Sequence, residues 1–393
     1  MARSRTVVVA GAGIGGLSAA LALAGKGFRV VVVDQAERLE ETGAGIQLSP
    51  NATRVLDRLG LTARLTGAAV APEAVLVRTH KGRGIVRIPL GASARQRYGA
   101  PYWVVHRADL QAALLGAVRA NPDIALRLGA RTEDFAVHPN GITVQLRSAR
   151  GAEDEHGIAL IGADGLWSTL RVRMGDNQPA RFAHRTAWRA MLPTHPLVSD
   201  FREPVISLWL GPRSHLVLYP VRGGEAVNLV AIVGDEWHEH GWSAPGRPEE
   251  VLAHYAEWPP VVRNLLALPD RWQKWALFDR APLRRWGKGP ITLLGDAAHP
   301  MLPFLAQGAA MAIEDAWVLA DCLAQNPDAP DRALRRYESK RRRRTARVQR
   351  AARQNGRIYH VGGPVAWLRN RALRARGGDS LLRRYDWLYG WQP

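Results

Sequence analysis

Cysteine is almost absent from this chain. Among 393 residues, Cys322 is the only one. A single thiol cannot build a disulfide scaffold, a cysteine-rich zinc site or a dithiol redox pair, so these classes of protein are excluded. The sequence predicts an intracellular protein that binds no metal.

Long hydrophobic runs are absent as well. The N-terminal stretch MARSRTVVVAGAGIGGLSAALALAGKG starts with basic residues and continues with apolar ones, as a signal peptide does. Five glycines between Gly11 and Gly25 interrupt it, and no segment reaches the roughly 18 uninterrupted apolar residues of a membrane span. We therefore predict no targeting sequence, no membrane association and a cytoplasmic location.

Acidic residues are scarce near the C-terminus. Residues 331–393 contain 17 arginines and one lysine against four acids, a net charge of +14 out of +19 for the whole chain. A nucleic-acid-binding protein usually carries its charge on a recognisable motif, and the sequence has no zinc finger, RNP motif or leucine zipper. Nucleic acid is not a predicted partner. A protein that acts on nucleic acid or a membrane surface through this segment stays an alternative, which salt-dependent retention on heparin would favour.

The same segment has the composition of a long helix. Residues 331–359 contain strong helix formers and no proline. Arginine stems can cover apolar surface while their charged ends stay in water, so we interpret the arginines as a solvated face of a structural helix. Glu338 is expected to pair with Arg342, and the following GGPVAWLRNRAL segment is a candidate surface for a homodimer. The predicted apolar stripe of the helix consists of Leu334, Tyr337, Val348, Ala351 and Ala352.

The N-terminal segment has the pattern of a dinucleotide-binding β–α–β unit. Strands are predicted over residues 6–10 and 28–33, with a helix over residues 17–24 between them. The turn Gly11-Ala12-Gly13-Ile14-Gly15-Gly16 satisfies G-x-G-x-x-G in the context that this motif requires. Its glycines permit a tight turn and close approach to a pyrophosphate, and the helix N-terminus favours the negative charge. Asp34 follows the second strand, where an acid accepts hydrogen bonds from a ribose.

Two later segments repeat the pattern of a strand, an acidic turn and a helix. LIGADGLWSTLR, from Leu160 to Arg171, places Asp164 directly after a short apolar strand. The segment from Ile291 to Leu323 places Asp296 after another such strand, and a helix is predicted to begin near Gly308. Taken singly, each segment is also compatible with an ordinary corner that an aspartate caps.

The stretch from Phe182 to Arg285 changes to an alternating pattern. PVISLWLG, HLVLYPV and AVNLVAIVG predict three strands that hairpins connect. Residues 70–103 are expected to add strands to the same antiparallel sheet. His215 and Tyr219 lie four residues apart and so share one face of their strand, about 13 Å apart at roughly 3.3 Å per residue. This face suggests a pocket wall, although a solvent-facing histidine beside a core tyrosine would give the same pattern.

The three motifs occur in the order GAGIGG, GADGLWSTLR and GDAAHPMLP…AQGAAMAIEDA. In this order they closely resemble single-component flavin hydroxylases of the para-hydroxybenzoate hydroxylase type. GAGIQLSPNATRVLDRLGL from Gly43, VHRADLQAAL from Val105 and RRRRTARVQRAARQNGRIYH near the end extend the resemblance over nearly the whole chain. The last of these is similar to the branch of 3-hydroxybenzoate 6-hydroxylase and salicylate hydroxylase.

The resemblance implies non-covalently bound FAD, with NADH or NADPH as a co-substrate. Asp34 is shorter than the glutamate that the family more often carries there, which implies a looser ribose contact. Ala306 stands where the family commonly has glycine, a variant that we treat as a marker of the 3-hydroxybenzoate 6-hydroxylase branch. The residues implied to bind FAD are Gly11, Gly13, Ile14, Gly15, Gly16, Asp34, Gly45, Ile46, Arg107, Asp164, Asp296, Gly308 and Ala309.

The resemblance also implies catalytic residues and a reaction. The 3-hydroxybenzoate 6-hydroxylase branch has the same His-x-x-x-Tyr, which makes His215 the candidate base for a substrate phenol. Gln307 and Tyr219 would orient its hydroxyl or carboxylate groups. NAD(P)H would reduce FAD, and O₂ would be captured as a flavin hydroperoxide that hydroxylates a small aromatic substrate. The sequence has no second G-x-G-x-x-G for a separate nicotinamide domain, and no cysteine pair of the disulfide-reductase flavoproteins.

Two further alternatives stay open. The same motifs occur in flavin monooxygenases that epoxidise or hydroxylate larger polyketide or terpenoid substrates, and a non-catalytic FAD-binding protein would also share them. The predicted fold class is α/β, with a Rossmann-like FAD-binding domain, an inserted and mainly antiparallel β-sheet substrate domain, and a C-terminal helical segment. The predicted boundaries are residues 1–70, 104–180 and 287–330 for the FAD-binding domain, 71–103 and 181–286 for the substrate domain, and 331–393 for the C-terminal segment.

Overall fold

The glycine-rich N-terminal segment folds as a β–α–β unit. In the computed structural model, which describes residues 5–39 and 44–393, the parallel strands β1 (Thr6–Ala10) and β2 (Arg29–Asp34) are connected by α1 (Ile14–Ala24). All of β1 is buried, because a parallel strand covered on both faces consists of apolar residues throughout. The predicted strands and helix are confirmed to within a few residues. Gly43, the first residue of the GAGIQLSPN segment, lies outside the described residues.

This unit belongs to a six-stranded sheet. Its strands pair in parallel except for the antiparallel edge pair. In order across the sheet they are β18 (Gly287–Lys288), β19 (Ile291–Leu293), β11 (Ala159–Gly162), β1, β2 and β7 (Ile124–Leu128). α1 packs against α9 (Gly308–Gln325) and α5 (Arg107–Arg119). The turns after β1, β2, β11 and β19 all lie at the carboxyl edge of the sheet, where open α/β sheets bind ligands.

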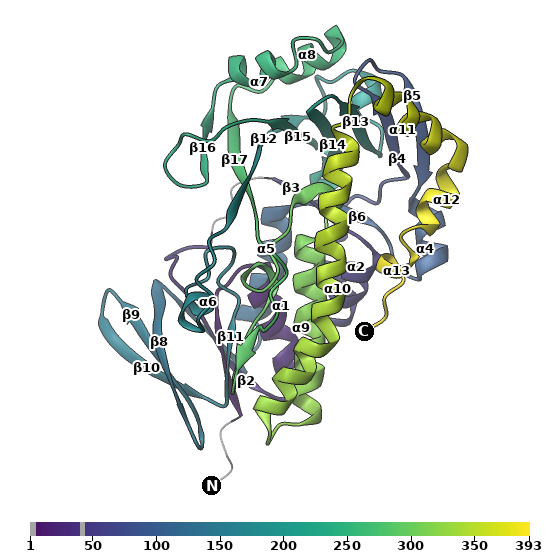
Figure 1. Cartoon of the computed structure of the whole chain (residues 1–393). Coiled ribbons are helices and arrows are strands. Elements are labelled where there is room, and N and C mark those ends of the chain that lie inside the picture. The colour runs from purple at the N-terminus through teal and green to yellow at the C-terminus, as the bar shows by residue number, and fades with distance from the viewer. Residues whose placement is uncertain (1–4, 40–43) are drawn as a thin grey trace.

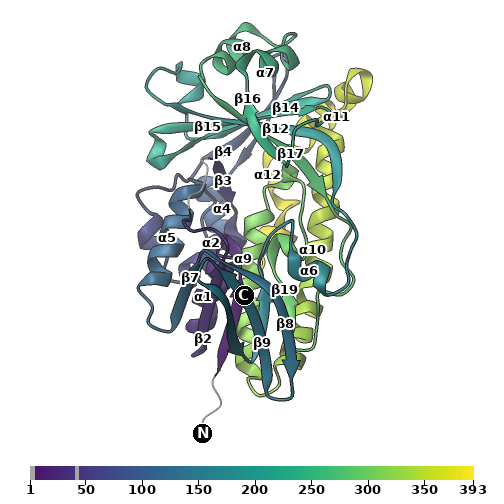
Figure 2. The ribbon, with the colours of Figure 1, turned by 90° about the vertical axis from the view of Figure 1, so that its left-hand side faces the viewer.

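An eight-stranded sheet lies across this carboxyl edge (Figure 2). The predicted hairpins are confirmed, because the three alternating runs form antiparallel neighbours. The predicted strands between residues 70 and 103 also join this sheet, through the sole parallel pair among its described strands. In order its strands are β16 (Ser243–Gly246), β17 (Trp272–Asp279), β12 (Arg181–Pro193), β15 (Ala226–Gly234), β14 (Ser214–Val221), β13 (Ile206–Gly211), β4 (Ala74–Thr79) and β5 (Gly84–Pro89).

Helices and small sheets cover the remaining faces. α7 (Pro248–His254) and α8 (Pro260–Ala267) lie beyond the eight-stranded sheet, and their apolar residues share its core (Figure 2). The sequence did not reveal an antiparallel sheet of β8 (Ala130–His138), β9 (Gly141–Ser148) and β10 (Gly151–Gly157). The other elements are β3 (Gly45–Leu48), β6 (Trp103–His106), α2 (Pro50–Arg58), α3 (Thr62–Leu65), α4 (Gly91–Tyr98) and α6 (Thr169–Arg173). The exact domain boundaries stay a prediction.

The basic C-terminal segment begins with the predicted long helix. α10 (Pro330–Tyr359) runs beside α9 along the length of the molecule (Figure 1). Four of the five predicted stripe residues are buried, and Ala351 is half-buried. Glu338 pairs with Arg335 at 2.8 Å, so the expected pairing with Arg342 is not the contact that forms. The chain continues through α11 (Gly363–Arg376), α12 (Gly378–Arg383) and α13 (Asp386–Tyr389), of which α11 and α12 pack against β5.

The interpretation of the arginine run as a solvated face is wrong for two of its members. Arg341 is only 1% exposed, and Arg344 is largely buried. Arg341 forms ion pairs of 2.6 Å with both Glu314 and Asp315 of α9, and Arg344 pairs with Glu314 at 2.7 Å. The physical reason is that α9 presents two buried carboxylates, which need cations at the interface between the two helices.

Candidate active site

Two connected cavities lie between the two large sheets. We call them the inner cavity, of about 340 Å³, and the outer cavity, of about 740 Å³. They share part of their lining, including Gly13, Arg107 and Asp296. The inner cavity is lined by the predicted residues Gly13, Ile14, Gly15, Gly45, Ile46, Arg107, His215, Tyr219, Asp296, Gln307, Gly308 and Ala309. Among the other predicted residues, Gly11, Asp34 and Asp164 line the outer cavity.

The glycine turn is closely packed at two of its glycines and open to the cavities at a third. A Cβ on Gly11 would lie 2.3 Å from the carbonyl oxygen of Ala163, and a Cβ on Gly16 would lie 1.9 Å from the carbonyl oxygen of Gly11. These two glycines therefore permit the tight packing of the turn. A Cβ on Gly13, in contrast, would meet no described atom within 4 Å, because this residue faces the cavities. The first turn of α1 starts beside it and offers backbone N–H groups to an anion.

Asp34 ends β2 at the outer cavity, as the sequence predicts. One carboxylate oxygen accepts a hydrogen bond of 2.6 Å from the backbone N–H of Ala12, and the other accepts one of 2.9 Å from Ala36. The Asp34 carboxylate thus stabilises the conformation of the glycine turn through its hydrogen bond with Ala12. Each oxygen keeps a further lone pair for a ribose hydroxyl, which is the contact that the family resemblance implies.

Two further aspartates face the cavities from the ends of β11 and β19. Oδ2 of Asp164 accepts hydrogen bonds from the backbone N–H groups of Thr169 (2.8 Å) and Leu170 (3.2 Å). Its Oδ1 is buried and has no hydrogen-bond partner among the described residues, so it is able to accept a hydrogen bond from a ligand in the outer cavity. Asp296 is accessible from the cavities but surrounded by protein. Burial raises its pKa, and the positive potentials of His299 and Arg107 act in the opposite direction.

β14 forms one wall of the inner cavity. His215, Val217 and Tyr219 all line it, whereas Leu216 and Leu218 lie in the core on the other side of the sheet. The predicted division of this strand into a cavity face and a core face is therefore confirmed. Nδ1 of His215 lies 2.7 Å from Nε2 of His360. Burial, His360 and Arg185 lower the pKa of His215 well below its ordinary value, so its imidazole is neutral near pH 7.

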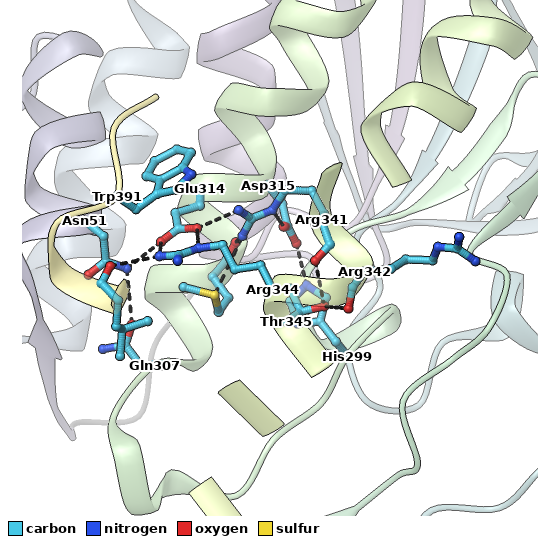
Figure 3. Close-up of polar contacts among 12 residues, drawn as sticks. Asn51, His299, Gln307, Glu314, Asp315, Arg341, Arg342, Arg344, Thr345 and Trp391 are labelled. Atoms are coloured by element: carbon cyan, nitrogen blue, oxygen red, sulfur yellow. Dashed lines mark hydrogen bonds and ion pairs between the residues drawn. The ribbon is translucent and has the colours of Figure 1, made fainter. Parts of the chain in front are cut away.

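Gln307 lies at the inner cavity, but its side chain already has protein partners. Its Nε2 donates to the hydroxyl of Ser49 at 2.8 Å, and its Oε1 accepts from Asn51 at 3.2 Å. Asn51 also donates to Glu314 at 2.6 Å (Figure 3). The side chain of Gln307 is thus tied to the ion-pair cluster between α9 and α10. Direct contact between Gln307 and the substrate stays a prediction.

The sequence did not reveal Arg189 as a site residue. It lies on β12, lines both cavities, and stacks over the ring of Trp275 at 4.9 Å. Its Nε is buried and has no hydrogen-bond partner among the described residues. Burial lowers its pKa, which is the mark of an uncompensated cation. The sequence signal that could have identified it is the single charged residue within the alternating run TAWRAML.

The chain matches the model of a family described as FAD binding domain over residues 4–352. The chain belongs to this FAD-binding domain family. It is 41% identical over 389 residues to 3-amino-4-hydroxybenzoate 2-monooxygenase PtnB3 of Streptomyces platensis, covering 98% of this chain and 96% of the relative. It is 39% identical over 392 residues to 3-hydroxybenzoate 6-hydroxylase of Polaromonas naphthalenivorans, with the same coverage. The protein is therefore an FAD-dependent monooxygenase.

Solved structures have the same architecture. HpxO of Klebsiella pneumoniae, solved with FAD and uric acid, superposes with a TM-score of 0.85 at 26% identity over 97% of this chain and 95% of that one. A salicylate hydroxylase substrate complex gives a TM-score of 0.83 at 25% identity over 100% and 97% of the two chains. The predicted α/β fold of this monooxygenase and its predicted FAD cofactor are thus confirmed.

Two negative findings concern residues 5–39 and 44–393. No helix in these ranges is long and apolar enough to cross a membrane. The same residues contain no group of three or more His, Cys, Asp or Glu side chains arranged to hold a metal ion.

Proposed function

We propose that this monooxygenase hydroxylates a small phenolic acid, using O₂ and NAD(P)H, and that the aromatic ring lies in the inner cavity. The observation that carries the proposal is the placement of a neutral, buried histidine on the wall of that cavity, beside the predicted cofactor-binding residues. The named relatives act on 3-amino-4-hydroxybenzoate and 3-hydroxybenzoate, which are both phenolic acids.

The size of the inner cavity supports a small substrate. Its volume of about 340 Å³ is at the lower end of the roughly 300–1,000 Å³ of ligand pockets, and cofactor-binding residues line part of it. A larger polyketide or terpenoid substrate would have to extend from the inner cavity into the connected outer cavity. The alternative of a larger substrate is tested by presenting both classes to the purified protein and following substrate-dependent NAD(P)H oxidation and product mass.

FAD, when bound, supplies the oxygen-activating chemistry, and the protein orients the substrate and keeps water out. The apolar side chains that line the inner cavity serve the second purpose. They include Val217, Val230, Ile232 and Met301. A dry cavity also strengthens the electrostatic effect of every charged group that faces it.

We infer that His215 accepts the phenol proton. The O–H bond of the substrate breaks, an N–H bond forms at Nε2, and the electron pair stays on the oxygen as a phenolate, which makes the ring a better nucleophile. An unperturbed phenol has a pKa of about 10, so a lowered histidine pKa makes the transfer unfavourable by itself. Arg189 lines the cavity and its positive charge stabilises a phenolate there, whereas Arg185 disfavours the imidazolium form of His215.

We propose that Arg189 anchors the substrate carboxylate. Its guanidinium faces the inner cavity with an unsatisfied Nε, and a carboxylate would satisfy it with a charge-assisted hydrogen bond. Tyr219 on the neighbouring wall keeps its hydroxyl protonated, because burial raises its pKa, and so acts as a neutral donor. Together these two residues would hold a phenolic acid with its hydroxyl group directed towards His215.

The test is the variant His215→Ala. We expect hydroxylation to slow by about 10²-fold, as for a missing general base, while the FAD content stays at the wild-type level. His254→Ala is the matched control, because this histidine is exposed on α7 and lines neither cavity. Turnover of His215→Ala at the wild-type rate across the pH range would refute the assignment.

Two finer proposals concern assembly and location. We propose that α11 forms a homodimer contact, because it exposes three apolar side chains, Val365, Trp367 and Leu368. Light scattering tests this: the molar mass should fall from that of a dimer to that of a monomer in Trp367→Ser.

We also propose a cytoplasmic location, because the co-substrate NAD(P)H is an intracellular metabolite.

A further inference from the structure

The end of the long C-terminal helix reaches the wall of the inner cavity. His360 directly follows α10, and its Nε2 lies 2.7 Å from Nδ1 of His215. Both side chains are buried, at 8% and 2% exposure, and their ring centroids are 4.8 Å apart. The backbone of His215 is fixed as well, since its carbonyl accepts a hydrogen bond of 2.8 Å from Tyr255. The 2.7 Å separation requires one shared proton, so one of these histidines donates to the other.

Several contacts of α10 hold His360 in this position. Asn355 donates to the carbonyl of Phe304 at 3.1 Å, and Gln349 donates to the carbonyl of Pro300 at 2.8 Å. The same helix thus fixes the loop from Pro300 to Phe304, part of which lines the cavities, and it also places His360 beside His215. The ion-pair cluster around Arg341 anchors the middle of the helix (Figure 3).

We propose that His360 is a positioning residue that selects the tautomer of His215. This inference rests on the proposed role of His215 as the base. If Nδ1–H of His215 donates to Nε2 of His360, then Nε2 of His215 carries a free lone pair for the phenol proton. If the direction is reversed, Nε2 of His215 is protonated and cannot act as a base. The direction of this one hydrogen bond therefore decides whether the site has a base.

The productive direction requires the proton of His360 to lie on Nδ1. With Nε2 turned to His215, the other nitrogen of His360 is Nδ1, which forms no well-aligned hydrogen bond among the described residues. Burial lowers the pKa of His360 to about 3, while the carbonyl of Gly356, one turn earlier in α10, acts in the opposite direction and favours a proton on the ring. A proton on Nδ1 leaves Nε2 of His360 as an acceptor. His360 can then receive the Nδ1–H of His215.

The pair stays neutral because the charged groups that face it are cations. Arg185 of β12 lowers the pKa of both histidines, and Arg369 of α11 lowers that of His360. The other close neighbours are the rings of Phe304 and Tyr359, which carry no charge. When the substrate proton reaches Nε2, His215 becomes an imidazolium, and its Nδ1–H still donates to a neutral His360.

The test compares His360→Phe with His360→Gln. Phenylalanine removes the acceptor, and we expect single-turnover hydroxylation to slow by about 10–100-fold with KM and FAD content little changed, a size typical of lost groups that orient a functional histidine. Glutamine offers an amide oxygen to Nδ1–H and should recover most of the rate. Arg357→Ala is the matched control, because this exposed residue lies in the same last turn of α10. Equal rates for wild type and His360→Phe would overturn the proposal.

A double-mutant cycle separates positioning from general support of the fold. In a His215→Asn background, His360→Phe should change the rate by less than about twofold, because no base is left to orient. If it slows that background as much as it slows the wild type, His360 is merely structural and the proposal falls. If His215→Asn itself reacts at the wild-type rate, the proposed function fails first.

Nitrogen NMR of ring-labelled histidine tests the tautomer directly in FAD-loaded wild-type protein. The signals of His215 are assigned by their loss in His215→Asn. We expect a protonated Nδ1 and an unprotonated Nε2. The opposite tautomer would overturn the proposal even if all the variants were impaired.

Discussion

Replacement of Arg341 by alanine tests how far α10 depends on buried ion pairs. Arg341 forms ion pairs of 2.6 Å with Glu314 and with Asp315 (Figure 3). All three side chains are at most 1% exposed. Truncation leaves two carboxylates in the interior. Glu314 keeps the cation Arg344 as a partner, whereas Asp315 keeps His299 and the backbone N–H of Gly295. Asp315 therefore carries most of the expected cost.

The expected loss in the free energy of unfolding is about 3–5 kcal/mol, because removing one partner of a buried ion pair typically costs that much. At roughly 2.1 cal/mol/K of unfolding entropy per residue, a cooperative unit of 393 residues would lose about 4–6 °C in Tm. Arg343→Ala is the control, because this exposed neighbour on the same helix should cost no more than about 0.5 kcal/mol. Alanine is a strong helix former, so neither change breaks the helix.

The pH dependence of the Arg341→Ala defect gives a second readout. Burial raises the pKa of Asp315, but His299 and Arg341 together outweigh burial and lower it. In the wild type, this carboxylate contributes stability above its unfolded pKa of about 3.9 and loses it as the pH falls. Without Arg341, one of the two groups that offset burial is lost and the pKa of Asp315 rises, so we expect its ionisation to oppose folding as the pH increases. The difference in Tm should therefore grow from pH 5 to pH 8.

The assay is thermal unfolding of both variants and wild type, at one excess FAD concentration so that ligand binding adds equally. Equal Tm values for Arg341→Ala and Arg343→Ala, within about 1 °C, would refute the reasoning. A defect that stays constant between pH 5 and pH 8 would show that the lost stability comes from packing rather than from the orphaned carboxylates.

Three further outcomes are expected. Asp296→Ala should weaken FAD binding by at least about fivefold, because the loss of a buried polar contact costs roughly 1–3 kcal/mol. An unchanged Kd for FAD in a flavin fluorescence titration would contradict this. Ala306→Gly should raise stability slightly, by up to about 1 kcal/mol, because Ala306 has φ of +51° in the left-handed region; a Tm below wild type would contradict it. kcat/KM should stay level from pH 8 down through pH 6.5 and fall only well below pH 6.5, because burial lowers the pKa of His215 well below its ordinary value, and His215→Asn should lack that acid limb.

The strain at Ala306 also explains a sequence observation. The family commonly has glycine at this position, and the structure shows the reason, because the residue adopts a left-handed conformation that favours glycine. The sequence revealed only that alanine replaces glycine here. Its backbone conformation comes from the turn that connects Pro303–Leu305 to α9.

Local rules of the chain determined the elements that are predicted to hold the cofactor. The glycine spacing at Gly11, Gly13 and Gly16, together with Asp34 at the end of β2, predicted both the turn and the helix that follows it. The alternation along β14 likewise predicted that His215 and Tyr219 share a face. These features depend on residues close together in sequence, so periodicity and motif spacing are sufficient to find them.

Contacts between distant segments were decided only by the tertiary structure. His215 and His360 are 145 positions apart, and no spacing rule connects them. The partners of Gln307 and the burial of Arg341 likewise depend on how α2, α9 and α10 pack together. An arginine in a basic run has the same sequence pattern whether it faces water or a buried carboxylate. Which of the two it meets is fixed by the helix that lies opposite, and the linear sequence does not specify that neighbour.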